Sequence, residues 1–135
     1  MIRNALIVTV FSLTAAIVPA QQAPVEVKEA HAPHYPPIAV LARVVGQVEV
    51  RVNIGSDGVV LSSEYESGPR MLQTPSTDAA KKWKFEADTG SNRVSILRFS
   101  YALLDEKAPD EEQTIFLPPD EIVVKHRPAA GNVQY

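Results

Sequence analysis

The sequence predicts an α+β fold, with a small antiparallel sheet of about three strands and two helices packed on it. Apolar and polar residues alternate from Gln47 to Glu66, and again from Val94 to Leu104. A period of two is typical of half-buried strands, so these regions predict a hairpin and a third strand. The segment before each region carries apolar residues at helical spacing, which predicts the two helices.

The composition is typical of one domain with tails, and it excludes several classes of protein. The chain has 135 residues, of which 45% are hydrophobic, and it contains no Cys. Without Cys there is no disulfide scaffold, no Cys-ligated zinc and no thiol nucleophile. The formal net charge of −3 is opposite in sign to the basic surface that nucleic acid requires, so we expect no nucleic-acid partner.

Residues 1–20 are predicted to be a secretory signal peptide. Arg3 precedes an apolar run from Ala5 to Val18, and the small residue Ala20 follows at a plausible cleavage site. The run is shorter than the roughly 20 residues that a membrane span needs. We therefore expect an exported protein, which in a Gram-negative cell is periplasmic. The alternative is an uncleaved inner-membrane anchor with the rest of the chain facing the periplasm.

The domain itself is expected to span residues 34–104, after a flexible leader over residues 21–33 that shows no sustained period. Pro36-Pro37 opens a short first helix, since Pro is tolerated in a first helical turn, and Gly46 ends it. Four apolar residues of this helix share helical spacing: Ile38, Leu41, Ala42 and Val45.

The predicted hairpin turns at Gly55–Gly58, where Asp57-Gly58 suits a tight turn. The second helix is expected to begin at Thr74-Pro75, with Thr74 as the N-cap. One face of this helix is expected to pack on the sheet through Leu72, Ala79, Ala80 and Trp83. Trp83 is the largest apolar side chain of the helix and therefore the expected core anchor.

Residues 105–135 are expected to form an acidic loop and a C-terminal extension. The acidic residues that follow Leu104 are typical of a solvated loop. Two short apolar runs come next, at 114–117 and 122–124, separated by Pro118-Pro119. Because Pro is tolerated at strand ends and sheet edges, these runs predict extra edge strands.

An ordered set of short motifs in residues 34–104 resembles the C-terminal domain of TonB-type energy transducers. The family has a Tyr-Pro before a short helix, a Gly-x-Val-x-Val strand start, an Asp-Gly turn, a Ser-Gly loop and a basic–basic–Trp–basic–aromatic helix end. The matching residues are Tyr35-Pro36, Gly46-Gln47-Val48-Glu49-Val50, Asp57-Gly58, Ser67-Gly68 and Lys81-Lys82-Trp83-Lys84-Phe85.

The resemblance implies a non-catalytic domain that captures an extended peptide of an outer-membrane receptor as an added strand beside its last strand. The family's receptor-contacting stretch, Gln-Pro-x-Tyr-Pro, has Ala32 here in place of its Gln. By this resemblance the partner-binding residues are Pro33, Tyr35, Pro36, Val94, Ile96, Arg98 and Ser100.

The extension suggests a further hypothesis. The runs at 114–117 and 122–124 would cover the binding edge of the third strand and block or regulate peptide capture. Deletion of residues 105–135 would then increase peptide binding or dimerisation.

The expected function is that of an exported, stand-alone module that binds a periplasmic or outer-membrane protein by strand addition, in TonB-dependent outer-membrane transport. A homodimer through sheet edges is also open. One alternative is a membrane-anchored transducer that couples an inner-membrane proton-driven motor to an outer-membrane receptor, although only a short stretch separates Ala20 from Tyr35. Another is a structural component of the envelope or of a secretion complex.

We expect no enzyme, cofactor or metal. The sequence has no Gly-x-Ser-x-Gly, no phosphate-binding glycine loop and no His-Glu-x-x-His. His31 and His34, with Glu29 nearby, have a spacing that zinc ligands use, but they lie in the expected leader. Glu64 and Glu66 share one face of a strand, where paired carboxylates are most simply solvated.

Overall fold

The computed structural model describes residues 25–88 and 90–129. The predicted signal peptide, residues 1–20, lies outside the described residues. Within them, no helix is long and apolar enough to cross a membrane.

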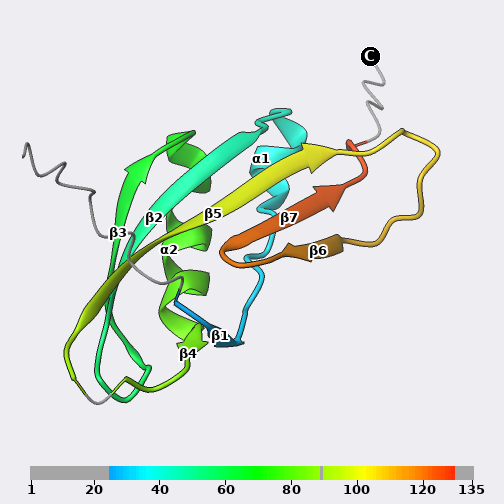
Figure 1. Cartoon of the computed structure of the whole chain (residues 1–135). Coiled ribbons are helices and arrows are strands. Elements are labelled where there is room, and N and C mark those ends of the chain that lie inside the picture. Colours follow the sequence, from blue (N-terminus) through cyan, green and yellow to red (C-terminus); the bar gives the residue numbers. More distant parts are fainter. Residues whose placement is uncertain (1–24, 89, 130–135) are drawn as a thin grey trace, which may run out of the picture.

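The helices and strands form a five-stranded sheet, a two-stranded sheet and a helical layer (Figure 1). In chain order they are β1 (Val27–Glu29), α1 (Pro37–Leu41), β2 (Gly46–Ile54), β3 (Val60–Ser67), the 3₁₀ helix η1 (Arg70–Leu72), α2 (Gln73–Lys82), β4 (Lys84–Phe85), β5 (Arg93–Leu103), β6 (Gln113–Leu117) and β7 (Glu121–His126). The large sheet has the order β3-β2-β5-β7-β6, and α2 packs against β2 and β3. The α+β class with two helices is confirmed.

The predicted sheet of about three antiparallel strands is too small, and its pairing is not wholly antiparallel. The chain leaves β5, passes one strand position to form the outer strand β6, and returns as β7 between them. As a result β7 pairs antiparallel with β6 but parallel with β5. Short apolar runs predict that strands exist but not which neighbour they choose, and this is why the sequence missed the arrangement.

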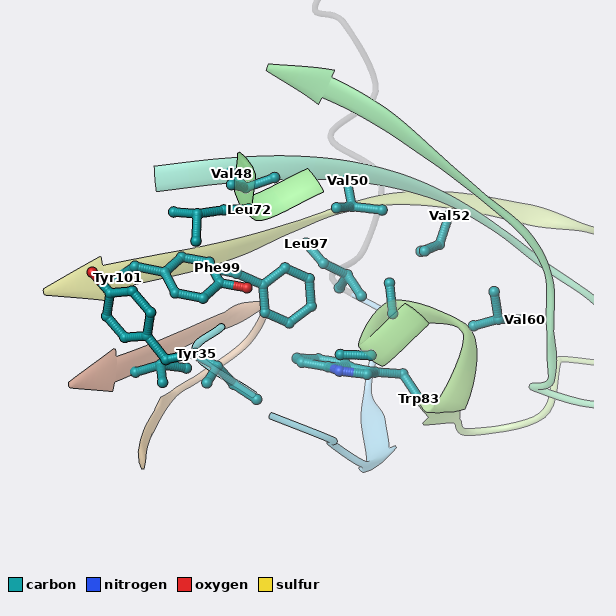
Figure 2. Close-up of a cluster of buried hydrophobic side chains, with 14 of the residues drawn as sticks. Tyr35, Val48, Val50, Val52, Val60, Leu72, Trp83, Leu97, Phe99 and Tyr101 are labelled. Atoms are coloured by element: carbon teal, nitrogen blue, oxygen red, sulfur yellow. The ribbon is translucent and has the colours of Figure 1, made fainter. Parts of the chain in front are cut away.

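The core lies between the sheet and the helical layer. Four side chains of β2 are completely buried: Val48, Val50, Val52 and Ile54. Tyr35 and Tyr101 lie side by side at one end of the core and Trp83 at the other (Figure 2). Trp83 is 1% exposed, packs edge-on against Phe99, and donates its indole N–H to the backbone oxygen of His31. The predicted packing role of Trp83 is confirmed.

The predicted hairpin is formed by β2 and β3, and its turn depends on a glycine. Gly58 has a φ of +85°, and a Cβ atom there would lie 1.9 Å from the backbone oxygen of Phe85. The register shifts next to the turn, so that Ile54 pairs with Val60. Val59 and Leu61, which a regular alternation places on one face of the second strand, are both exposed. The residue between them, Val60, is buried instead.

The first helix buries a different face from the one its spacing suggests. Ile38, Leu41 and Val45 are exposed, whereas Ala39 and Val40 are buried. The reason is Tyr35, which is buried just before the helix and is hydrogen-bonded to the chain just after it. The Tyr35 hydroxyl donates to the backbone oxygen of Val44 at 2.5 Å, which fixes the side of the helix that meets the core.

Part of the expected leader belongs to the folded domain. Within residues 21–33, Val27 and Glu29 of β1 pair with β4, and Pro33 is buried. A three-residue strand is too short to show a period of two, so no local pattern predicted β1.

Candidate functional site

The predicted binding strand β5 is open along only part of one edge. Its first edge pairs with β2 from residue 93 to residue 101. Its second edge pairs with β7 over residues 98–103, and over residues 93–97 no strand of the described chain pairs with it. This stretch is called the open edge below.

The open edge presents backbone groups for a further strand. The backbone N–H of Arg98 donates to the backbone oxygen of Asp120 at 2.9 Å, so Arg98 points its backbone groups toward the β7 side. Alternate residues of a strand point the same way, so Val94 and Ile96 direct their N–H and C=O groups to the open edge. A short extended segment would find four backbone hydrogen-bonding groups there.

The side chains of Val94 and Ile96 project from the sheet face opposite to buried Leu97 and Phe99. They are 44% and 38% exposed, respectively. On that face the register places Arg51 of β2 opposite Ile96. The open edge therefore combines apolar side chains, a nearby cation and unpaired backbone, which together suit an extended peptide.

Arg98 and Ser100 are already engaged by the C-terminal hairpin formed by β6 and β7. The guanidinium of Arg98 contacts the Asp120 carboxylate, with 2.7 Å between Nη2 and Oδ1. The Ser100 hydroxyl donates to Glu121 Oε1 at 2.9 Å. These two residues of the predicted site hold β7 in place.

Pro33 and Tyr35 lie inside the fold, and Pro36 is half-buried. Tyr35 packs edge-on against Tyr101, with ring centroids 5.2 Å apart, and its backbone N–H donates to Glu112 Oε2 at 3.0 Å. Burial raises the pKa of the Tyr35 hydroxyl above its ordinary value. The structure therefore does not bring the Tyr-Pro stretch and the β5 residues together on one exposed surface.

Two hollows flank the C-terminal hairpin. One, of about 320 Å³, is lined by Tyr35 and Val40 and by His126 and Pro128. The other, of about 400 Å³, lies between Val27 of β1 and Phe116 of β6. Both are lined by residues of the C-terminal extension as well as by the domain.

Several residues considered for metal or acid–base chemistry pair with one another or with a neighbouring charged side chain. His31 Nε2 lies 2.7 Å from Glu29 Oε1, and this contact, followed by the charge of Lys84, lowers the pKa of Glu29. His34 lies 3.1 Å from Glu112, and Glu66 lies 3.9 Å from Arg51. Over residues 25–88 and 90–129, no three His, Cys, Asp or Glu side chains are grouped so that they could hold a metal ion.

The comparison with known proteins agrees with this fold. Residues 31–103 match the family described as the Gram-negative bacterial TonB protein C-terminal. The chain belongs to this family. Two curated relatives, each called Protein TonB, come from Xanthomonas campestris pv. campestris strains B100 and ATCC 33913. Each is 42% identical over 64 residues, which is 46% of this chain and 29% of the relative, so the chain spans less than a third of their length.

The TonB C-terminal match ends at Leu103, which is also the last residue of β5. The C-terminal hairpin that covers part of the β5 edge therefore lies outside the matched region. The sequence predicted both strands of this hairpin, and their position after β5 suggested that they cover it. It did not indicate that β7 stops short of residues 93–97, because strand register depends on contacts that a local pattern does not contain.

Proposed function

We propose that this chain is an exported, non-catalytic partner-binding module of the cell envelope, acting in TonB-dependent outer-membrane transport. The observation that carries the proposal is the open edge of β5, where Val94 and Ile96 expose both backbone groups and side chains. Membership of the TonB C-terminal family supports the same role. The partner is an extended segment of a periplasmic or outer-membrane protein.

The neighbouring turn limits the length of the segment that binds. An added strand beside residues 93–97 lies in line with β7, so it meets the turn at Pro118–Asp120. The C-terminal hairpin therefore leaves room for a strand of about five residues at 3.3–3.4 Å per residue. We propose that Arg98 and Ser100 become partner-binding residues only when β7 separates from β5.

Pro33, Tyr35 and Pro36 have a supporting role in this proposal. Tyr35 links the loop after α1, β5 and the loop before β6 through its contacts with Val44, Tyr101 and Glu112. We propose that these residues hold the sheet in shape and do not touch the partner while the hairpin is in place.

Site-specific photo-cross-linking in the native host tests the proposal. A benzophenone amino acid at Ile96 is expected to form an adduct with a protein of the periplasm or outer membrane. The same probe at Leu61, which is exposed on the opposite edge strand β3, is the matched control. Equal adducts from both positions, or none from Ile96, would overturn the proposal.

A second candidate is a membrane-anchored energy transducer, which the name of the two Xanthomonas relatives favours. The intact mass and the fractionation of the protein in its host distinguish the two. A soluble periplasmic species that begins at Gln21 supports the exported module. A full-length species in the inner membrane supports the transducer.

A further inference from the structure

The outer strand β6 is an unusual sheet edge because it is apolar and uncovered. All five of its residues are exposed, and Ile115, Phe116 and Leu117 are each 42–43% exposed. No further strand of the described chain pairs with β6 on its outer side. Natural sheets usually protect such edges with charges, bulges or a covering segment.

Both faces of this edge carry apolar side chains. Ile115 pairs with Val123 of β7, whose side chain lies on the face opposite to buried Ile122 and Val124. Phe116 pairs with Ile122 and reaches the inner layer, where its ring lies edge-on to Trp83 at 6.0 Å between centroids. Phe116 also borders the hollow of about 400 Å³, so the inner side of the edge is only partly filled.

The charge pattern of β6 suits pairing with itself. Residues 113–117 contain no charged side chain. The opposite edge strand β3 carries Glu64 and Glu66, so two copies of β3 side by side would bring carboxylates together. The two edges of one sheet therefore differ in whether a second copy can approach.

A two-fold axis at Ile115, the central residue of β6, pairs all five residues of the strand with the second copy. Antiparallel pairing about Ile115 places Gln113 of one copy opposite Leu117 of the other. Pro118, which has no N–H to donate, then falls outside the paired residues and opposite Glu112. The acidic residue that precedes β6 thus faces a neutral residue of the second copy.

We propose that β6 is a self-association surface, through which two copies of this chain join their five-stranded sheets into one continuous sheet. Ile115 meets its own counterpart on the outer face, and the two Phe116 rings are diagonal neighbours on the inner face. The pairing involves five residues of each chain, so the dimer is weak and depends on protein concentration. This proposal does not depend on what the open edge of β5 binds.

Single-cysteine cross-linking tests the register directly, because the chain contains no Cys of its own. Ile115→Cys is expected to form a disulfide-linked dimer under mild oxidation. Gln113→Cys and Leu117→Cys are each expected to remain monomeric, because about 13 Å then separates the two sulfur-bearing residues along the strand. A mixture of these two variants is expected to give the cross-linked heterodimer.

Val94→Cys is the matched control, since Val94 is exposed to a similar degree on the same sheet. Cross-linking of Val94→Cys as fast as Ile115→Cys would overturn the proposal. So would adducts of Ile115→Cys with other proteins of the host but not with itself, which would mean that β6 binds a foreign segment.

Sedimentation equilibrium gives a second readout with the protein in the form its host produces. The mass of the unmodified protein is expected to rise toward twice the monomer mass as concentration increases. Ile115→Lys is expected to remain monomeric, whereas Leu61→Lys, an exposed change on β3, is expected to behave like the unmodified protein. A monomer at every concentration, or equal effects of the two substitutions, would overturn the proposal. Circular dichroism of each variant confirms that it is folded.

Discussion

The two hairpins on either side of β5 use the same local pattern with different results. In the hairpin of β2 and β3, every second residue of β2 from Val48 to Ile54 is completely buried. In the C-terminal hairpin, β7 buries Ile122 and Val124 but β6 buries no residue. One cause of the difference between β2 and β6 is that α2 packs against β2. Position in the sheet matters as well, because β2 lies between β3 and β5 whereas β6 is the outer strand.

The two hairpins also differ in how they are held to β5. Nine residue pairs join β2 to β5, whereas six join β7 to β5. The contact between β7 and β5 is reinforced by Arg98–Asp120 and Ser100–Glu121, which are partly exposed polar contacts. The C-terminal hairpin is therefore the half of the sheet that we expect to open first.

The largest effect is expected at Trp83. Its ring packs against Phe99 of β5 and also against Phe116 of the C-terminal hairpin. Trp83→Ala should lower the free energy of unfolding by about 3–5 kcal/mol, because it removes a buried aromatic ring and leaves a cavity. Phe116→Ala is the matched control and should cost about 1 kcal/mol, since its ring is half-exposed. Urea unfolding measures both, and equal losses would contradict the difference in packing.

Two valine-to-alanine substitutions, one in each hairpin, test whether the first hairpin contributes more to stability than the C-terminal hairpin. Val52→Ala in β2 removes two methyl groups from a completely buried site and should cost about 1.5–3 kcal/mol. Val123→Ala in β7, on the sheet face away from α2, should cost less than about 1 kcal/mol. Thermal and urea unfolding of the two variants give these values. A larger loss for Val123→Ala would mean that another surface covers that face.

Alkaline pH should weaken the region where the two hairpins meet around Tyr101. Burial raises the pKa of the Tyr101 hydroxyl well above its ordinary value of 10. Below pH 10 the hydroxyl is protonated in both folded and unfolded chains, so it adds no pH dependence. As pH rises through 10, the unfolded chain loses the proton first, and stability falls by up to about 1.4 kcal/mol per pH unit.

Urea unfolding between pH 8 and pH 11 measures this slope. Tyr101→Phe is the control, because it removes the hydroxyl and should reduce the slope by about one proton. The variant also loses the contact with Ser76, at 2.8 Å, so its stability is lower at every pH. An unchanged slope in Tyr101→Phe would contradict the assignment.

The smallest effect is expected at the contact that ties the C-terminal hairpin to β5. Asp120→Asn removes a charge that lies 2.7 Å from Arg98, and the partly exposed pair should contribute about 1 kcal/mol or less. Hydrogen exchange should become faster for amides of β7 than for those of β2. Binding at the open edge should increase if β7 limits the length of the captured segment.

Asp120→Asn tests whether β7 limits the length of the captured segment more cleanly than deletion of residues 105–135 does. Deletion also removes Ile122 and Val124 from the core, so the fold would be weakened together with the cover on β5. Uniformly faster exchange in every strand of Asp120→Asn would mean that the hairpin does not open as a separate unit.

Much of the fold follows from patterns that the chain carries locally. The alternation in β2 and β5, the glycine turn and the apolar face of α2 each predict an element that the structure contains. The motifs between Tyr35 and Phe85 indicated the TonB C-terminal family, which the family match confirms. The partner-binding role of the predicted site residues remains a prediction. The sequence did not indicate that Tyr35 is buried or that Arg98 and Ser100 contact the C-terminal hairpin.

The sequence by itself determined the class of fold, the hairpin of β2 and β3, the extent of β5 and the burial of Trp83, since each depends on residue spacing within one segment. Only the tertiary structure decided that β7 lies parallel to β5, that it begins opposite Arg98, and that β6 becomes an outer edge. It also decided that Tyr35 belongs to the core. The physical reason is that strand order, register and the burial of a single side chain depend on contacts between distant segments, which a local period of two or 3.6 residues does not encode.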